Sequence, residues 1–148
     1  MSATIVPTVL ERLPELHGEK ARRWLELAVQ HAFTFCRDVH GYHEPADVDS
    51  VRIMAVSVWV TSKGKPSWDK LDVDHCIELA RSIGCGHESI EAFTLNINAF
   101  VCFLNKFSLI DNGEAVRISD HVQPLLAPLF ERFLASQQPA PSDEAMLN

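Results

Sequence analysis

The chain has 148 residues, of which 47% are hydrophobic and 22% are charged, and its 20 acidic and 13 basic residues give a formal net charge of −7. This length and composition predict one folded domain over residues 1–136 that requires neither a metal ion nor a disulfide for its stability. The acidic excess disfavours binding to nucleic acid, and the uncharged stretches are shorter than the ~20 residues of a membrane span.

The N-terminal segment lacks the basic residues of a secretory signal, and we therefore expect a cytoplasmic protein.

Apolar residues over 5–16 predict a short amphipathic arm. Apolar positions over 19–39 recur every three or four residues and predict a long helix that Gly41 ends. Residues 51–61 are apolar on nearly all sides and rich in β-branched residues. We interpret them as a central helix, with a strand as the alternative.

The middle of the chain predicts one loop and two further helices. Gly64 and Pro66 break the pattern over residues 62–69, which places Trp68 in a loop where solvent or a partner could reach it. Asp72 or Asp74 caps a helix through residue 83, and the most regular apolar stripe in the chain predicts another helix over 88–107.

The C-terminal third contains an Asn-Gly dipeptide, the strongest short-range signal for a β-hairpin. Asn112-Gly113 stands between two short apolar runs and predicts a hairpin over residues 108–118. Ser119 then caps a last helix to about residue 136, bent by two prolines. That helix packs through Leu125, Leu126, Leu129, Phe130 and Phe133. Residues 137–148 form a disordered tail. The predicted fold is a mostly α-helical, single-domain bundle of five to six helices with one short β-hairpin.

Residues 72–119 resemble a winged helix-turn-helix domain. The apolar contacts, turn glycine and wing that carry the resemblance are Leu79, Ala80, Ile83, Gly84, Cys85, Ile90 and Phe93, then residues 104–110, Asn112-Gly113 and residues 116–119. The resemblance implies a DNA-binding regulator. His87 would then be a DNA-binding residue, and Arg81, Lys106 and Arg117 would contact the DNA backbone. The start of the second helix departs from this pattern, because Glu88 and Glu91 stand where base-reading residues are needed.

Histidine and cysteine residues near the end of the first long helix suggest a metal site as a further alternative. Cys36 and His40 are four residues apart and can share one helical face, and His43 follows closely. The spacing matches no zinc motif, and we expect all four cysteines to be reduced core residues. No cofactor is expected.

Catalytic signatures are weak in this sequence. His75 and Cys76 are adjacent on a helix, so that their side chains point about 100° apart and do not meet. The chain contains no phosphate-binding glycine loop and no nucleophile-elbow motif. We therefore expect a protein without enzyme activity.

Aromatic and basic residues in two loops suggest a partner-binding face. Tyr42 and Trp68 are the aromatic residues, and Lys63 and Lys65 stand close to Trp68 in the chain. Tyrosine and tryptophan dominate interface hot spots. The sequence therefore favours a regulator, inhibitor or assembly factor that binds another protein, or a second copy of itself, at these residues.

Overall fold

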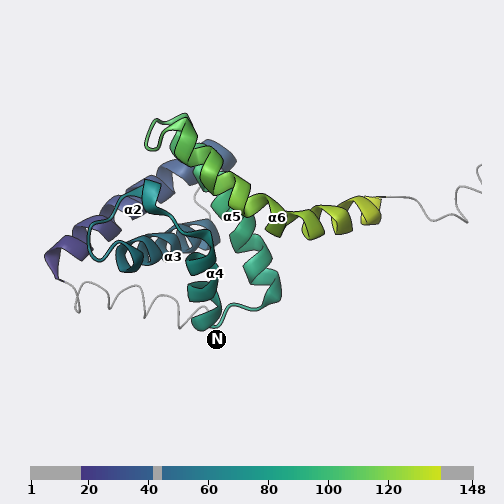
Figure 1. Ribbon diagram of the computed structural model, residues 1–148, viewed down its shortest axis with the longest axis horizontal. Coiled ribbons are helices and arrows are strands. Elements are labelled where there is room, and N and C mark those ends of the chain that lie inside the picture. The colour runs from purple at the N-terminus through teal and green to yellow at the C-terminus, as the bar shows by residue number, and fades with distance from the viewer. Residues whose placement is uncertain (1–17, 42–44, 138–148) are drawn as a thin grey trace, which may run out of the picture.

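The computed structural model describes residues 18–41 and 45–137 of the chain (Figure 1). Within these ranges the chain forms five α-helices and one short 3₁₀ helix, and no strand. Their bounds are α2 Glu19–His40, α3 Pro45–Thr61, η1 Trp68–Lys70, α4 Val73–Ser82, α5 His87–Lys106 and α6 Asn112–Gln137. The predicted arm over 5–16 and all but the first residue of the predicted tail lie outside the described ranges. None of the described helices is sufficiently long and apolar to cross a membrane.

Helix α3 is the centre of the fold. Helices α2, α4 and α5 pack against it, and Val51, Met54 and Val58 are completely buried. This surrounding burial explains why residues 51–61 are apolar on nearly all sides. Their α-helical structure confirms the predicted helix and not the alternative strand. The helix begins six residues earlier than predicted, at Pro45, a residue well suited to the first helical turn.

Helix α2 covers one side of α3, as the apolar periodicity of residues 19–39 predicts. It ends at Gly41, which adopts the left-handed conformation with φ 77° and donates its N–H to the carbonyl of Arg37. The indole Nε1 of Trp24 donates a hydrogen bond of 2.8 Å to the carbonyl of Ala55. This bond joins α2 to the middle of α3.

The predicted exposure of Trp68 is wrong, because the chain turns back onto the core at η1. Trp68 is only 4% exposed. Its ring centroid lies 4.8 Å from that of Trp24 and 4.9 Å from that of Phe100, and its Nε1 donates a 3.0 Å hydrogen bond to Nδ1 of His31. The indole therefore fills the space between α2 and α5, and its polar atom is satisfied inside the protein.

Helices α4 and α5 confirm the two middle predictions. The Asp72 carboxylate accepts the N–H of His75 at 3.1 Å and caps α4, and Gly84 turns the chain with a φ of 99°. The regular stripe of α5 lies in the core. Its buried members include Phe93, Ile97, Phe100 and Leu104.

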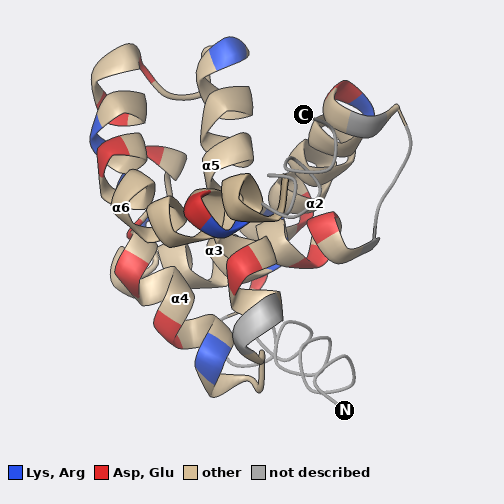
Figure 2. Ribbon diagram, turned by 90° about the vertical axis from the view of Figure 1, so that its right-hand side faces the viewer, with Lys and Arg blue, Asp and Glu red and all other residues tan. Residues whose placement is uncertain are grey.

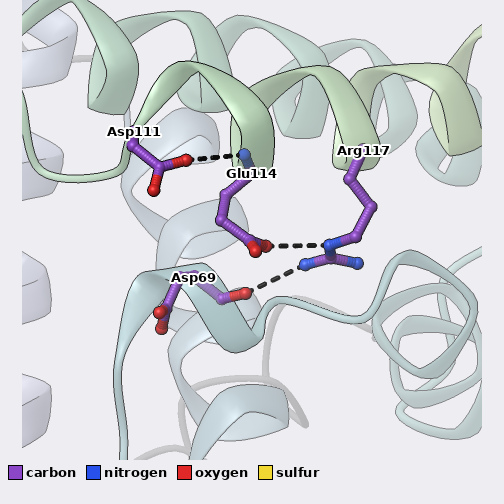
Figure 3. A network of polar contacts seen from close by, with 4 residues as sticks. All are labelled: Asp69, Asp111, Glu114 and Arg117. Atoms are coloured by element: carbon purple, nitrogen blue, oxygen red, sulfur yellow. Dashed lines mark hydrogen bonds and ion pairs between the residues drawn. The ribbon is translucent and has the colours of Figure 1, made fainter.

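The predicted hairpin over residues 108–118 is wrong, because Asn112 and Gly113 form the first turn of α6. The Asp111 carboxylate accepts the N–H of Glu114 at 2.8 Å and caps this helix (Figure 3). An aspartate three residues before a glutamate is itself a helix-start signal, and it outweighs the turn preference of Asn-Gly here. Ser119, the predicted cap, lies within the helix.

Arg117 fixes the start of α6 against η1. Its Nε donates to the Glu114 carboxylate at 2.8 Å, and a terminal guanidinium nitrogen donates to the carbonyl of Asp69 at 2.9 Å (Figure 3). Because Asp69 follows Trp68 directly, this contact holds the 3₁₀ turn that carries the buried indole.

We expect Asp111→Ala to lower the free energy of unfolding by about 1 kcal/mol, because the substitution removes the side-chain acceptor of the α6 cap. Urea titration followed by circular dichroism measures this loss. Asp111→Asn is the matched control, since asparagine caps about as well as aspartate and should retain most of the stability. Equal losses in the two variants would contradict the capping role of the side chain.

Candidate functional site

The C-terminal half of α6 exposes large apolar side chains. In Figure 1 the yellow-green end of this helix extends beyond the other helices. Phe133 is 58% exposed and Leu134 is 61% exposed, and Leu125 and Phe130 are also exposed. We call these four residues the α6 surface. The sequence predicted that Leu125, Phe130 and Phe133 pack in the core, and the structure shows that they do not.

The α6 surface continues the stripe that anchors α6 in the core. Ala115, Ile118, Val122 and Leu126 are buried and lie three or four residues apart. Leu129 and Phe133 extend the same spacing. Leu129 packs partly against the core, whereas Phe133 lies beyond the helices that would cover it. The stripe has the pattern of a buried helix face without an intramolecular partner for its last turns.

An apolar groove adjoins the α6 surface where α6 crosses α4 and α5. Its volume is about 200 Å³, and its apolar walls include Ile77, Ile90, Leu125 and Leu129. Arg81 and Arg132 contribute to its rim, and Arg132 forms an ion pair with Glu91. The groove adjoins the exposed helix end, so that the two form one apolar feature of the described surface.

The residues predicted to bind a partner do not form one surface of aromatic and basic side chains. Trp68 is buried, whereas Lys63 and Lys65 are exposed after α3. Tyr42 lies outside the described residues. Trp68 therefore does not contribute to a partner-binding surface, contrary to the prediction from the sequence.

The basic residues predicted to contact DNA are dispersed. Lys106 lies at the end of α5 and pairs with Asp38 at 2.7 Å. Arg117 pairs with Glu114, and Arg81 lines the apolar groove. In Figure 2 the blue segments alternate with red and uncharged ones on the helices. The side chain of His87 is not among the described ones.

The predicted metal ligands are not assembled in the described part of the chain. Cys36 is completely buried in the core between apolar side chains. His43 and the side chain of His40 lie outside the description. Among the described residues, no group of three or more His, Cys, Asp or Glu residues could hold a metal ion. Of the other cysteines, Cys76 is buried as expected, but Cys85 is half-buried and Cys102 is exposed.

A partly buried polar cluster joins α3 to α4, and the sequence analysis does not predict it. The Ser57 hydroxyl lies 2.7 Å from Nδ1 of His75. Burial raises the pKa of the Cys76 thiol to about 12, although a hydrogen bond with Ser57 opposes this shift. Ser57 is completely buried. The available signal was the hydroxyl of Ser57 within the apolar run of residues 53–60. Its partners come from another helix, which the local sequence does not show.

His31 makes the stability of the fold depend on pH. Burial lowers the pKa of this imidazole from its ordinary value of 6.5, and its Nδ1 accepts the bond from Trp68. The unfolded chain therefore binds a proton at a pH where the folded chain does not, so stability falls as the pH drops below about 6.5 and returns as it rises. In His31→Gln, we expect the free energy of unfolding to change less between pH 5 and 7.5, because glutamine keeps a hydrogen-bond acceptor but does not titrate.

Urea titrations of both proteins at the two pH values measure this difference. An identical pH dependence in the wild type and His31→Gln would contradict the role of His31.

Comparisons of the chain with models of protein families, with curated proteins and with solved structures found no match.

Proposed function

We propose that this protein is a non-catalytic regulator, inhibitor or assembly factor that recognises a protein through the α6 surface. The exposure of Phe133 and Leu134 on a helix face patterned for burial carries the proposal. Phe130, Phe133 and Leu134 lie on one side of the helix, and their exposed parts amount to roughly 300 Å² of apolar surface. Contiguous apolar patches of this size mark interaction sites on soluble proteins.

The burial of Ser57 and the protonation of Cys76 support the proposal that the protein is not an enzyme. An activated nucleophile must be accessible and readily deprotonated. Ser57 is completely buried against His75, and the pKa of about 12 keeps the Cys76 thiol protonated at neutral pH. Ser57 connects α3 to α4 through its hydrogen bonds with His75 and Cys76.

Site-specific photo-cross-linking in the native cell tests the proposed surface. A photoreactive amino acid replaces Phe133 in one variant and Val116 in the control variant. Both positions lie on α6 and are similarly exposed, 58% and 56%, but only Phe133 belongs to the α6 surface. We expect a specific cross-linked protein species from position 133 and none from position 116. No cross-link at 133, or equal cross-links at both positions, would contradict the proposal.

DNA binding through α4 and α5 is the second candidate function. It is supported by the order of two helices around the turn at Gly84, which is that of a helix-turn-helix element. Pairing of Lys106 and Arg117 with acidic residues weakens this candidate. A mobility-shift assay at low salt separates the two functions, because binding through phosphate contacts is strongest there. A shift that disappears as salt rises would support DNA binding.

A further inference from the structure

We propose that the groove between α4, α5 and α6 binds a small amphipathic anion, a monocarboxylate with an unbranched alkyl chain of about eight carbons. The alkyl chain lies along the apolar walls, and the carboxylate meets the guanidinium of Arg81. This inference does not depend on the proposed function, because the ligand fills the groove and not the exposed end of α6.

Three helices build the apolar walls of the groove. Ile77 comes from α4, Ile90 from α5, and Leu125 and Leu129 from α6. Thr94 also lines the groove, but its hydroxyl donates a 2.7 Å hydrogen bond to the carbonyl of Ile90 and needs no partner from a ligand. The walls therefore suit an alkyl chain better than a polar group.

The charged side chains of the groove come from the end at which α4 turns into α5. Arg81 belongs to the last turn of α4, and the short turn after it leads directly into α5. Arg132 of α6 is held at the same end, because it pairs at 2.5 Å with Glu91 near the start of α5. Ile77 lies one helical turn before Arg81. The groove is therefore cationic at one end and apolar along its length.

Arg81 gives the groove a positive charge without a counterion. The guanidinium of Arg132 neutralises the carboxylate of Glu91. Arg81 is exposed and forms no ion pair with the side chains that the structure describes. A ligand carboxylate supplies the partner that this guanidinium lacks, through charge-assisted hydrogen bonds. A cationic headgroup at the same place would be repelled.

The size of the groove sets the length of the alkyl chain. The stretch of α6 from Leu125 to Arg132 lines it and is roughly 10 Å long, at the helical rise of about 1.5 Å per residue. An extended chain of about eight carbon atoms, with bonds of about 1.5 Å, has a similar length. The groove volume of about 200 Å³ is below the range of about 300–1,000 Å³ for larger ligands, and it favours a single alkyl chain.

Methyl NMR of the full chain with sodium octanoate as the probe tests the site. Isoleucine labelling places reporters at Ile77 and Ile90 in the groove, and at Ile53 in α3 as the buried control. We expect up to about 5 mM octanoate to shift the first two signals, with a dissociation constant below about 1 mM, and to leave that of Ile53 unchanged.

Two further probes separate the roles of charge and chain length. Octylammonium has the same chain length and the opposite charge, and should bind at least about tenfold more weakly because it meets Arg81. Butanoate keeps the carboxylate but lacks four methylene groups. It should bind at least about tenfold more weakly, because less apolar surface leaves water.

Variants of the chain identify the groups that bind octanoate. Arg81→Gln should raise its dissociation constant about threefold to tenfold, because the positive charge is lost. Arg23→Gln is the matched control at an exposed position on α2 and should have no effect. Leu125→Trp should weaken binding at least about tenfold, because the indole fills the groove. Val116→Trp, at an exposed position on the same helix, should not. Circular dichroism establishes that the variants are folded.

The outcomes separate this inference from the proposed function. Unshifted Ile77 and Ile90 signals at the highest octanoate concentration would overturn the carboxylate site. Equal binding of octanoate and octylammonium, or of octanoate to the wild type and to Arg81→Gln, would overturn it as well, because Arg81 would then not select the ligand. Shifts throughout the protein would show nonspecific uptake and have the same consequence. None of these results affects the cross-linking test at position 133.

Discussion

Trp68→Ala should lower the free energy of unfolding by about 3–5 kcal/mol, the range measured when a large aromatic side chain is removed from a protein core. The indole is 4% exposed and contacts the rings of Trp24 and Phe100. The substitution leaves a cavity between α2 and α5 and deprives His31 of its hydrogen-bond donor. Urea titration followed by circular dichroism measures the loss.

Trp68→Phe is the matched control for this prediction. A phenyl ring keeps most of the packing and removes the Nε1 donor, so we expect a smaller loss than for alanine. Stability unchanged by Trp68→Ala would contradict the buried position and would return Trp68 to the accessible loop that the sequence suggests.

Phe100→Ala should cause a second loss of about 3–5 kcal/mol. Phe100 is completely buried, and its ring centroid lies 5.3 Å from that of Phe35 and 5.6 Å from that of Phe103. It also contacts Trp68, so that it joins α2, η1 and α5. Because domains are stable by only about 5–15 kcal/mol, this variant is close to the limit of folding.

Phe100→Leu keeps the variant series measurable, because leucine preserves much of the buried volume and should cost less than alanine. The measurement is again the midpoint and slope of urea unfolding. The combined loss in the Trp68→Ala and Phe100→Leu double variant should differ from the sum of the single losses, because the two rings touch. A strictly additive result would contradict their contact.

The helices that the sequence predicts well are those whose apolar spacing is long and regular. Residues 19–39 and 88–107 show this spacing, and α2 and α5 follow it. Residues 51–61 show no such periodicity, because this part of α3 is buried on nearly all sides. Their helical form depends on the three helices that surround them, which the local sequence does not reveal.

The errors in the prediction arise where local and long-range signals compete. Asn112-Gly113 favours a hairpin locally, but Asp111 caps a helix at the same place. Trp68 lies in a stretch with loop composition, yet contacts with α2 and α5 bury it. Such contacts join residues more than 30 positions apart, and apolar spacing carries no information about them.

The sequence identifies the residues of the candidate site but not their exposure. The sequence identifies the apolar residues of the last helix and assigns them to the core, because a helical stripe indicates burial without indicating against what. Leu126 is buried within the chain, and Phe133 is not. The distinction depends on where the neighbouring helices end. The groove and its Arg81 likewise require the packing of three helices.

Hydrogen–deuterium exchange of the full chain, alone and together with the protein that cross-links at position 133, tests most directly whether a partner covers the α6 surface. The C-terminal end of α6 extends beyond the other helices (Figure 1), so its last amides should exchange quickly in the chain alone. We predict that the partner slows their exchange strongly, leaves the amides of α3 unchanged, and has no effect on Phe133→Asp. Exchange at the end of α6 that is equally fast with and without the partner would contradict the account.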